Sequence, residues 1–387
     1  LMKVLLRAPL LTSSGYGVHS RQIFEWLYGK KNLDLTVECL AWGQTPWLLN
    51  EKKENGLVGK IMSCSRPIKG PYDITFQVQL PDEWDVSLGK YNVGITAAVE
   101  TDRCNPKWIE ACNKMDRIVV PSTFTKSVLK RSGICMKQIS VIHESFHESI
   151  LKESTKVHDI EFETNFNFLI VGQMGSMNSN NDRKNIYNTI NTIINTFQNN
   201  ENVGIVIKTN LGRGSTIDKK LCIDVFNKMK KSINTVYKNK IYLLHGNMTN
   251  EEISSLYTHP QIKCLVSATR GEGYGLPLVE AAASGLPIIA TNWSGHLDFL
   301  GEKFLKINYS LKEIHESRID NRIFFKGHKW AEPDLQDFSN KLKLFYNDRQ
   351  KYYNQALNLK IEVLNNFSKK KIENMYEELF NKIIKEI

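Results

Sequence analysis

The sequence lacks the features that mark several classes of protein. Its seven cysteines are an odd number with no C-x-x-C spacing, which argues against a disulfide framework or a thiolate zinc site and indicates reduced thiols. Glycine and proline are sparse, at 23 and 11 of 387 residues, so a collagenous or low-complexity chain is excluded. No apolar run is long enough to span a bilayer, and no signal sequence with a cleavage site opens the chain. We therefore expect a cytoplasmic protein.

The composition is that of a large globular chain. Hydrophobic residues make up 41%, and 387 residues fit two domains of comparable size. The net charge of +10 favours an anionic partner such as a nucleotide, a phospholipid surface or a nucleic acid. The spacing of a helix-turn-helix, an RRM or a zinc finger is missing, so we expect no nucleic-acid partner.

Short apolar runs alternate with helical patterns in both halves of the chain. The expected strands are 3–8, 35–42, 73–78, 92–98, 117–120, 138–142, 166–171, 203–208, 240–245, 263–267 and 287–291. The expected helices are 18–28, 106–115, 123–131, 185–197, 217–237, 250–257 and 277–284. This alternation predicts parallel sheets covered on both faces by helices, an α/β fold. We expect domains over 1–150 and 166–345, a polar linker over 151–165, and C-terminal helices over 346–387.

The most informative segment runs from Ala268 to Thr291. A strand ends at Ser267, a glycine-dense turn follows, and a helix opens at Gly275 with Pro277 in its first turn. The free amides and the dipole of that helix start are suited to a phosphate.

Two glutamates accompany this helix start. Glu272 lies in the turn and Glu280 within the first two helical turns, so both carboxylates can converge on one ligand. A carboxylate accepts hydrogen bonds from sugar hydroxyls well. The alternative is an ordinary strand–turn–helix with both glutamates facing solvent.

With Glu272 and Glu280 spaced as E-x7-E, the sequence resembles glycosyltransferase family 4, closely from Phe166 onward and more loosely before it. The resemblance implies the GT-B fold, in which two Rossmann-like doubly wound domains face a cleft and the final helices cross back to the first domain. It also implies a retaining, metal-independent transfer of a sugar from a nucleotide-diphosphate donor to an acceptor hydroxyl, without a cofactor.

Roles for individual residues follow from the resemblance. Glu272 would contact the donor sugar and Glu280 the nucleotide ribose. The diphosphate would be held by the backbone amides of the turn, Gly273, Tyr274, Gly275 and Leu276.

A basic pair opens the helix after the strand at 166–171. The family places an Arg and a Lys there, matching Arg183 and Lys184, to neutralise the donor diphosphate. The alternative is a surface basic pair. Gln173 stands where many members carry a further Arg, and we expect Lys208, at the end of a strand, to supply replacement charge.

In the front half, Gly15 and Gly17 follow the first strand and match a loop that the family uses against the donor. An ordinary turn fits them equally. The stretch 94–103 has no His where many members carry one, so either Glu100 or Asp102 would orient the acceptor hydroxyl, or these carboxylates cap the helix near Pro106.

His143 and His147 match H-E-x-x-H, but they follow a strand and no helix is expected there, so we predict no metal site. His245 and His296 lie near strand ends, where each either touches the donor or is structural.

The acceptor would be a saccharide, a lipid-linked glycan or a small molecule, with peripheral contact to an anionic membrane. A non-catalytic nucleotide-sugar-binding subunit and a GT-B epimerase or phosphorylase are the competing functions.

Overall fold

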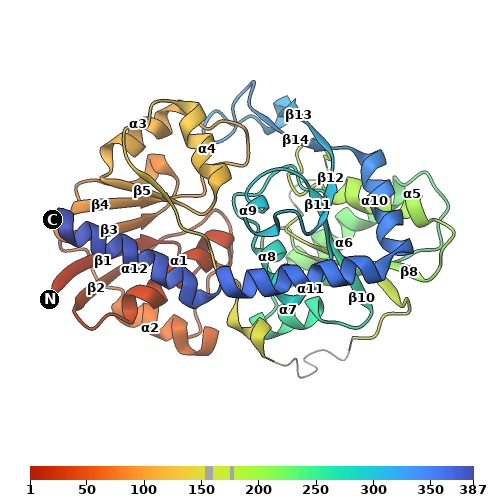
Figure 1. The fold of residues 1–387 in the computed structure, drawn as a ribbon, viewed down its shortest axis with the longest axis horizontal. Helices are drawn as coiled ribbons and strands as arrows, with labels where there is room; N and C mark the ends of the chain where they lie inside the picture. The colour runs from red at the N-terminus through yellow and green to blue at the C-terminus, as the bar shows by residue number, and fades with distance from the viewer. Residues whose placement is uncertain (153–159, 175–177) are drawn as a thin grey trace. The chain divides into compact units, whose positions relative to one another are not determined.

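The computed structural model describes residues 1–152, 160–174 and 178–387, and within these the chain divides into two compact units. Unit 1 comprises Leu1–Ser145 and Lys369–Ile387, and unit 2 comprises Phe146–Ser368. Each unit is built on a six-stranded parallel sheet with helices on its faces (Figure 1). No helix of the described residues is long and apolar enough to cross a membrane.

The sheet of unit 1 has the strand order β2-β1-β3-β4-β5-β6. Its strands are β1 (Met2–Ala8), β2 (Leu33–Cys39), β3 (Tyr72–Val78), β4 (Gly89–Ile95), β5 (Arg117–Val120) and β6 (Ile139–Val141). Its helices are α1 (Gly15–Tyr28), α2 (Leu57–Cys64), α3 (Pro106–Lys114), α4 (Thr123–Ser132) and α12 (Lys369–Glu386), with 3-10 turns η1 (Glu54–Gly56) and η2 (Pro81–Glu83).

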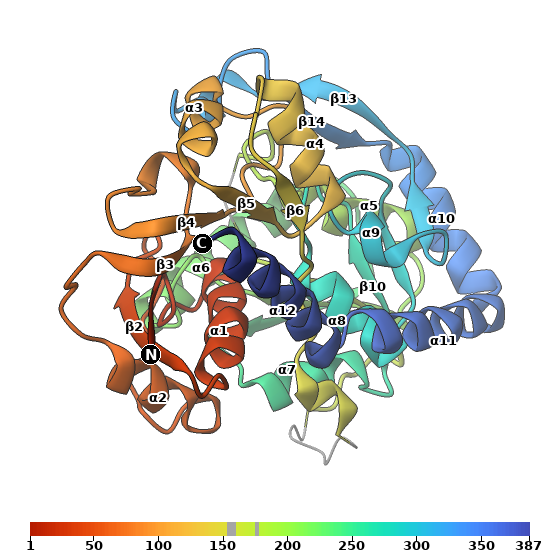
Figure 2. The ribbon, with the colours of Figure 1, turned by 60° about the vertical axis from the view of Figure 1, so that its left-hand side comes forward.

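The last helix of the chain belongs to the core of unit 1. One face of α12 buries Ile372, Tyr376, Leu379, Phe380 and Ile383 among residues of α1 and the sheet, beside α1 (Figure 2). Polar side chains fix the register of this packing, because Glu377 accepts from Lys30 and Trp26 and Glu386 from Arg117. The C-terminal segment therefore returns to the N-terminal unit.

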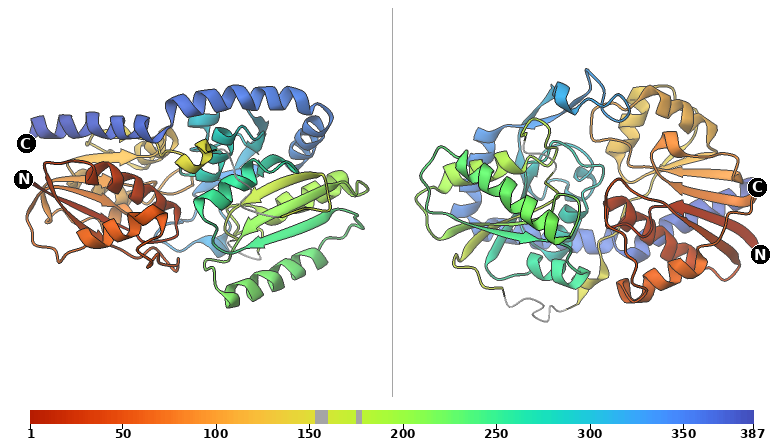
Figure 3. Two further views of the ribbon diagram at one scale, coloured as in Figure 1. Left: turned by 90° about the horizontal axis from the view of Figure 1, so that it is seen from below. Right: turned by 180° about the vertical axis from the view of Figure 1, so that it is seen from behind.

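The sheet of unit 2 has the order β12-β11-β10-β7-β8-β9. Its strands are β7 (Phe166–Val171), β8 (Val203–Thr209), β9 (Lys240–His245), β10 (Ile262–Ser267), β11 (Ile288–Thr291) and β12 (Leu305–Ile307), with the antiparallel pair β13 (Tyr309–Glu313) and β14 (Lys329–Pro333). Its helices are α5 (Ile186–Phe197), α6 (Thr216–Lys231), α7 (Asn250–Tyr257), α8 (Leu276–Ser284), α9 (Leu297–Leu300), α10 (Leu335–Asn347) and α11 (Arg349–Asn366), with η3 (Glu148–Leu151) and η4 (Glu316–Arg318). Figure 3 shows α6 along one face of this sheet, which its Phe226 and Met229 cover.

The boundaries of the units differ from the predicted ones. The predicted C-terminal segment 346–387 is split, because α11 packs on α8 in unit 2 and only α12 joins unit 1. Of the linker predicted over 151–165, residues 153–159 lie outside the described residues, and its last part packs in unit 2. There the side chain of Phe162 is buried and its backbone N–H donates to Gln261 Oε1 at 2.9 Å.

The strand order of unit 2 reverses between β7 and β10, which are parallel neighbours. Both strands end at the same edge, and their following loops leave in opposite directions. Ligands of open α/β sheets bind at the carboxyl ends of the strands at such a reversal. The corresponding reversal in unit 1 lies between β1 and β3.

Candidate functional site

Two loops meet at the reversal point of unit 2. The loop after β7 carries Arg183 and Lys184, and the loop after β10 carries Glu272. The Lys184 ammonium lies 2.6 Å from Glu272 Oε1, and the Arg183 guanidinium lies 3.3 Å from Glu272 Oε2. The structure thus brings together three of the residues that the sequence predicted to bind a donor.

Glu272 is buried but fully ionised. Burial by itself would raise the pKa of its carboxyl, but the charges of Lys184 and Arg183 outweigh that effect and lower the pKa to about 2. Thr269 Oγ1 also donates to Glu272 Oε1, at 3.0 Å. The Glu272 carboxylate is therefore held in place by two cations, and the same cations are of the kind that pair with a more highly charged anion such as a phosphate.

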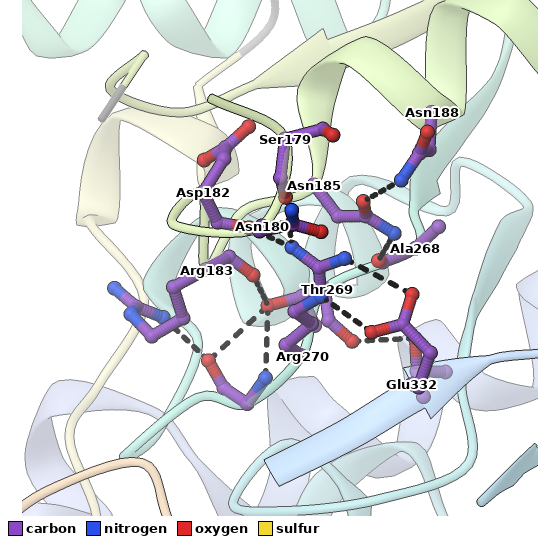
Figure 4. A network of polar contacts seen from close by, with 12 residues as sticks. Ser179, Asn180, Asp182, Arg183, Asn185, Asn188, Ala268, Thr269, Arg270 and Glu332 are labelled. Atoms are coloured by element: carbon purple, nitrogen blue, oxygen red, sulfur yellow. Dashed lines mark hydrogen bonds and ion pairs between the residues drawn. The ribbon is translucent and has the colours of Figure 1, made fainter. Parts of the chain in front are cut away.

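A tight turn directs the two cations toward Glu272. Asp182 accepts hydrogen bonds from the backbone N–H of Lys184 at 3.1 Å and of Ile186 at 2.7 Å, so it caps the start of α5. Asn185 takes a left-handed φ of 57°, and its side chain donates to the carbonyl of Ala268 at 3.0 Å, next to β10 (Figure 4). The turn is therefore fastened to the strand that precedes Glu272.

Arg270 holds the same loop from the other side (Figure 4). Its guanidinium donates to the carbonyls of Ser179 and Asp182, and it forms a two-pronged pair with Glu332 of β14 at 2.9 and 3.0 Å. The Arg270 backbone N–H donates to the Arg183 carbonyl at 2.8 Å. Sequence reasoning missed Arg270 and Glu332, because nothing in the spacing of two residues 62 positions apart predicts their pairing.

The loop after β11 supports the glycine turn. Ser294 Oγ accepts from the Glu272 N–H at 2.8 Å, and the Gly295 N–H donates to the Glu272 carbonyl at 2.9 Å. A Cβ at Gly295 would lie 2.1 Å from the Gly273 carbonyl oxygen, so only glycine fits. His296 is buried and its Nε2 pairs with the Thr291 carbonyl at 2.7 Å, while its Nδ1 has no hydrogen-bond partner among the described residues.

The helix after the turn begins as predicted, with Gly275 as N-cap at φ 104° and Pro277 in the first turn. Gly275 offers no side chain to cap the first amides of α8. Glu280, half-buried in α8, accepts a hydrogen bond from the hydroxyl of Tyr257 of α7 at 3.0 Å. Burial raises the pKa of Glu280 to about 7, against a smaller lowering by this hydrogen bond.

Two further predicted residues lie at the ends of β8 and β9. The Lys208 ammonium donates to the Gly246 carbonyl at 2.7 Å, and burial lowers its pKa. His245 Nε2 lies 2.6 Å from Asp218 Oδ2, and Asp218 also accepts from the backbone N–H of Leu211 and Arg213. His245 therefore has a structural partner that fixes the loop after β8. Asp218 was missed by sequence reasoning, which had only its place near a helix start.

The glycine loop of unit 1 is closed by its own packing. A Cβ at Gly17 would lie 2.2 Å from the Thr12 carbonyl oxygen, whereas Gly15 is exposed with nothing near its Cβ position. Buried Arg21 donates to the carbonyls of Leu10 and Thr12. Gly17 is thus required by the contact of α1 with the preceding loop.

Glu100 and Asp102 lie in the loop between β4 and α3. The N-cap of α3 is Asn105, whose side chain accepts from the Lys107 N–H at 3.0 Å, so the alternative that one of these carboxylates caps the helix is wrong. Asp102 lies 3.5 Å from the guanidinium of Arg103.

The two histidines of H-E-x-x-H bond to neighbouring groups of the same chain. His143 Nδ1 pairs with the Pro121 carbonyl, and His147 Nδ1 with Ser149 Oγ, both at 2.9 Å. Within residues 1–152, 160–174 and 178–387, no group of three or more His, Cys, Asp or Glu side chains is arranged to hold a metal ion.

Comparison with known proteins gives one family match and many similar folds. The model of the family described as glycosyl transferases group 1 matches residues 224–356. This segment includes Glu272 and Glu280, whereas Arg183 and Lys184 lie before it. No curated protein matches the chain.

Solved structures match over the whole chain. Sucrose-phosphate synthase from Thermosynechococcus elongatus is 13% identical with a TM-score of 0.66, covering 100% of both chains. The Anabaena protein HepE, solved with UDP and glucose, is 12% identical with a TM-score of 0.66, covering 99% of this chain and 100% of its own. A glycosyltransferase from Rickettsia africae is 14% identical with a TM-score of 0.63, covering 99% of each chain. These matches confirm the predicted fold class, two Rossmann-like α/β domains of the GT-B type.

Proposed function

We propose that this protein is a glycosyltransferase that moves a sugar from a nucleotide-diphosphate donor to an acceptor hydroxyl, with retention of configuration and without a metal. The observation that carries the proposal is the cluster at the reversal point of unit 2, where the buried Glu272 carboxylate pairs with the half-buried Lys184 and Arg183. The family match over residues 224–356 and the UDP and glucose bound by HepE support the same chemistry.

The cluster is suited to a diphosphate leaving group. As the bond between sugar and diphosphate breaks, negative charge grows on the phosphate oxygens and positive charge on the sugar ring. Lys184 and Arg183 would stabilise the departing charge, together with the amides of Gly273, Tyr274, Gly275 and Leu276.

The two glutamates have different ionisation states, which suits different tasks. Glu272 is ionised across the physiological range and accepts hydrogen bonds from donor sugar hydroxyls. Glu280, whose pKa lies near neutrality, would hold the ribose. Lys208 and the glycines Gly15 and Gly17 complete the proposed donor contacts.

On the acceptor side, we assign Glu100 or Asp102 to orient the acceptor hydroxyl or to take its proton late in the reaction. The acceptor class is a saccharide, a lipid-linked glycan or a small molecule. Co-sedimentation with anionic and neutral vesicles would test the proposed peripheral contact with a membrane, and equal recovery from both would contradict it.

A donor screen tests the proposal directly. Melting temperatures measured with UDP-, GDP- and ADP-sugars should rise for the true donor, because a ligand that binds only the folded state stabilises it. Transfer or donor hydrolysis is then followed with and without EDTA, and NMR of the product gives its anomeric configuration. A reaction that EDTA inhibits would contradict the proposed metal independence, and an inverting reaction would contradict the proposed retention of configuration.

The second candidate is a non-catalytic nucleotide-sugar-binding subunit. Gln173 in place of an Arg, and the absence of His from residues 94–103, favour it. Donor binding without turnover across varied acceptors would select this function. An epimerised donor or a dependence on phosphate would select a GT-B epimerase or phosphorylase instead.

A further inference from the structure

A pair of thiols lies in unit 1, apart from every residue assigned above. Cys112 is buried in α3, and Cys135 is half-buried in the segment after α4. Their side chains hydrogen-bond to each other. Both cysteines are free, so the two interacting thiols are not joined by a covalent bond.

The backbone around this contact is fixed by the neighbouring Asn113. Its side-chain amide donates to the carbonyl of Ile134 at 2.9 Å, and its oxygen accepts from the N–H of Met136 at 2.8 Å. These bonds hold the two residues that flank Cys135 against the helix that carries Cys112. The backbone of the segment that holds Cys135 is therefore fastened to the helix that carries Cys112.

The pair is accessible from one side. Ile134 and Met136 are 85% and 77% exposed, so the segment holding Cys135 lies at the surface while Cys112 lies beneath it. The hydrogen bond from Cys112 lowers the pKa of Cys135, which favours its thiolate. The same contact, with burial, raises the pKa of Cys112.

We propose that Cys112 and Cys135 form a redox-active pair that a peroxide converts to a reversible disulfide. The Cys135 thiolate would attack one peroxide oxygen, breaking the O–O bond and giving a sulfenic acid and hydroxide. The Cys112 sulfur then displaces the sulfenic hydroxyl, and its proton leaves with that hydroxyl as water. Two thiols and one peroxide become one disulfide and two waters, and a dithiol reductant reverses the change.

The disulfide would lock the segment after α4 onto α3. This region also supports the loop that carries Glu100 and Asp102, because Ser132 at the end of α4 accepts from the Cys104 N–H at 2.7 Å. The proposal itself does not depend on the function assigned to that loop.

The experiment treats the reduced full-length protein with one equivalent of hydrogen peroxide. We expect the intact mass to fall by about 2 Da, the mass of two hydrogens. Peptide mapping without reductant should join Cys112 to Cys135, and dithiothreitol should restore the original mass. In the untreated protein, a limiting amount of iodoacetamide at pH 7 should label Cys135 about tenfold faster than Cys39, whose pKa burial raises to about 11.

Two variants separate this pair from general oxidation. Cys135→Ser should abolish the loss of mass, whereas Cys64→Ser, at another half-buried cysteine, should leave it unchanged. The proposal is overturned if peroxide leaves all thiols titratable, if other cysteines become joined, or if Cys135 is oxidised beyond the sulfenic acid without bonding to Cys112.

Discussion

The two units share an architecture but differ in the chemistry at the point where strand order reverses. In unit 1 the polar groups after β1 are satisfied by neighbouring backbone, as the bonds from Arg21 to the carbonyls of Leu10 and Thr12 show. In unit 2 the corresponding position holds charged side chains that pair with one another, Glu272 with Lys184 and Arg183. In the first arrangement a cationic side chain bonds to backbone carbonyls, and in the second, side chains of opposite charge pair with one another.

This difference shows that a glycine-rich turn after a strand does not by itself indicate a ligand site. Gly17 is needed because α1 approaches the carbonyl of Thr12, and Gly295 because its loop approaches the carbonyl of Gly273. In unit 2 the closely packed loops also hold side chains of both charges, Glu272 with Lys184 and Arg183. The glycines allow the loops to come together and do not by themselves identify a binding site.

The largest expected effect is the loss of turnover when a charge is removed from unit 2. Lys184→Ala should lower turnover by about 100- to 1000-fold, because a stabiliser of the leaving diphosphate is lost. The melting temperature should also fall, because the buried Glu272 carboxylate loses a charge partner, so turnover is compared at a temperature at which both proteins are folded. The control is Lys228→Ala, which removes an exposed lysine of α6. Near-normal turnover in the Lys184 variant would contradict the assignment of this cluster to the donor.

In unit 1 the expected large effect is on stability. Gly17→Ala should lower the free energy of unfolding by about 2–3 kcal/mol, because the new methyl group would overlap the Thr12 carbonyl. Gly15→Ala, whose Cβ would meet open space, should change it by less than about 0.5 kcal/mol. Urea unfolding measures both. Equal stabilities would show that the loop is loose rather than closed.

A smaller effect is expected from Arg270, which only positions the loop that carries Arg183 and Lys184. Arg270→Gln removes the pair with Glu332 and the bonds to the Ser179 and Asp182 carbonyls, so Arg183 and Lys184 should be less ordered. We expect the KM for the donor to rise about tenfold with a smaller change in kcat. Arg270→Lys should recover part of the loss. Altered melting with an unchanged KM would mean that Arg270 acts on stability alone.

A change in pH dependence is expected at Glu280. Its folded pKa of about 7 lies above the ordinary value of 4.5, so between these values the folded chain binds more protons than the unfolded chain. The stabilisation is complete below pH 4.5 and is lost as the pH rises through 7. Glu280→Gln should remove this slope in urea unfolding measured at pH 5 and 7.5. An identical slope in both proteins would contradict the raised pKa.

Much of the fold could be predicted from local patterns, while several partners could not. The strand at 166–171 and the helix start at Gly275 and Pro277 depend on residues next to one another, and the structure places them as expected. The hairpin of β13 and β14 was missed because every residue of β13 is exposed, so it carries no alternation of buried and exposed positions. Helix α11 was assigned to the wrong unit because an amphipathic pattern does not say which apolar surface it covers.

Local patterns in the sequence were enough to predict most of the elements and the α/β class. The signals for these lie within one helical turn or one strand, where neighbours in the chain are also neighbours in space. The tertiary structure alone decided that Lys184 and Arg183 would face Glu272, 88 residues from Lys184, and that Arg270 would pair with Glu332. Those pairings depend on the order in which strands join the sheet, and the energy that selects that order is shared across the whole core.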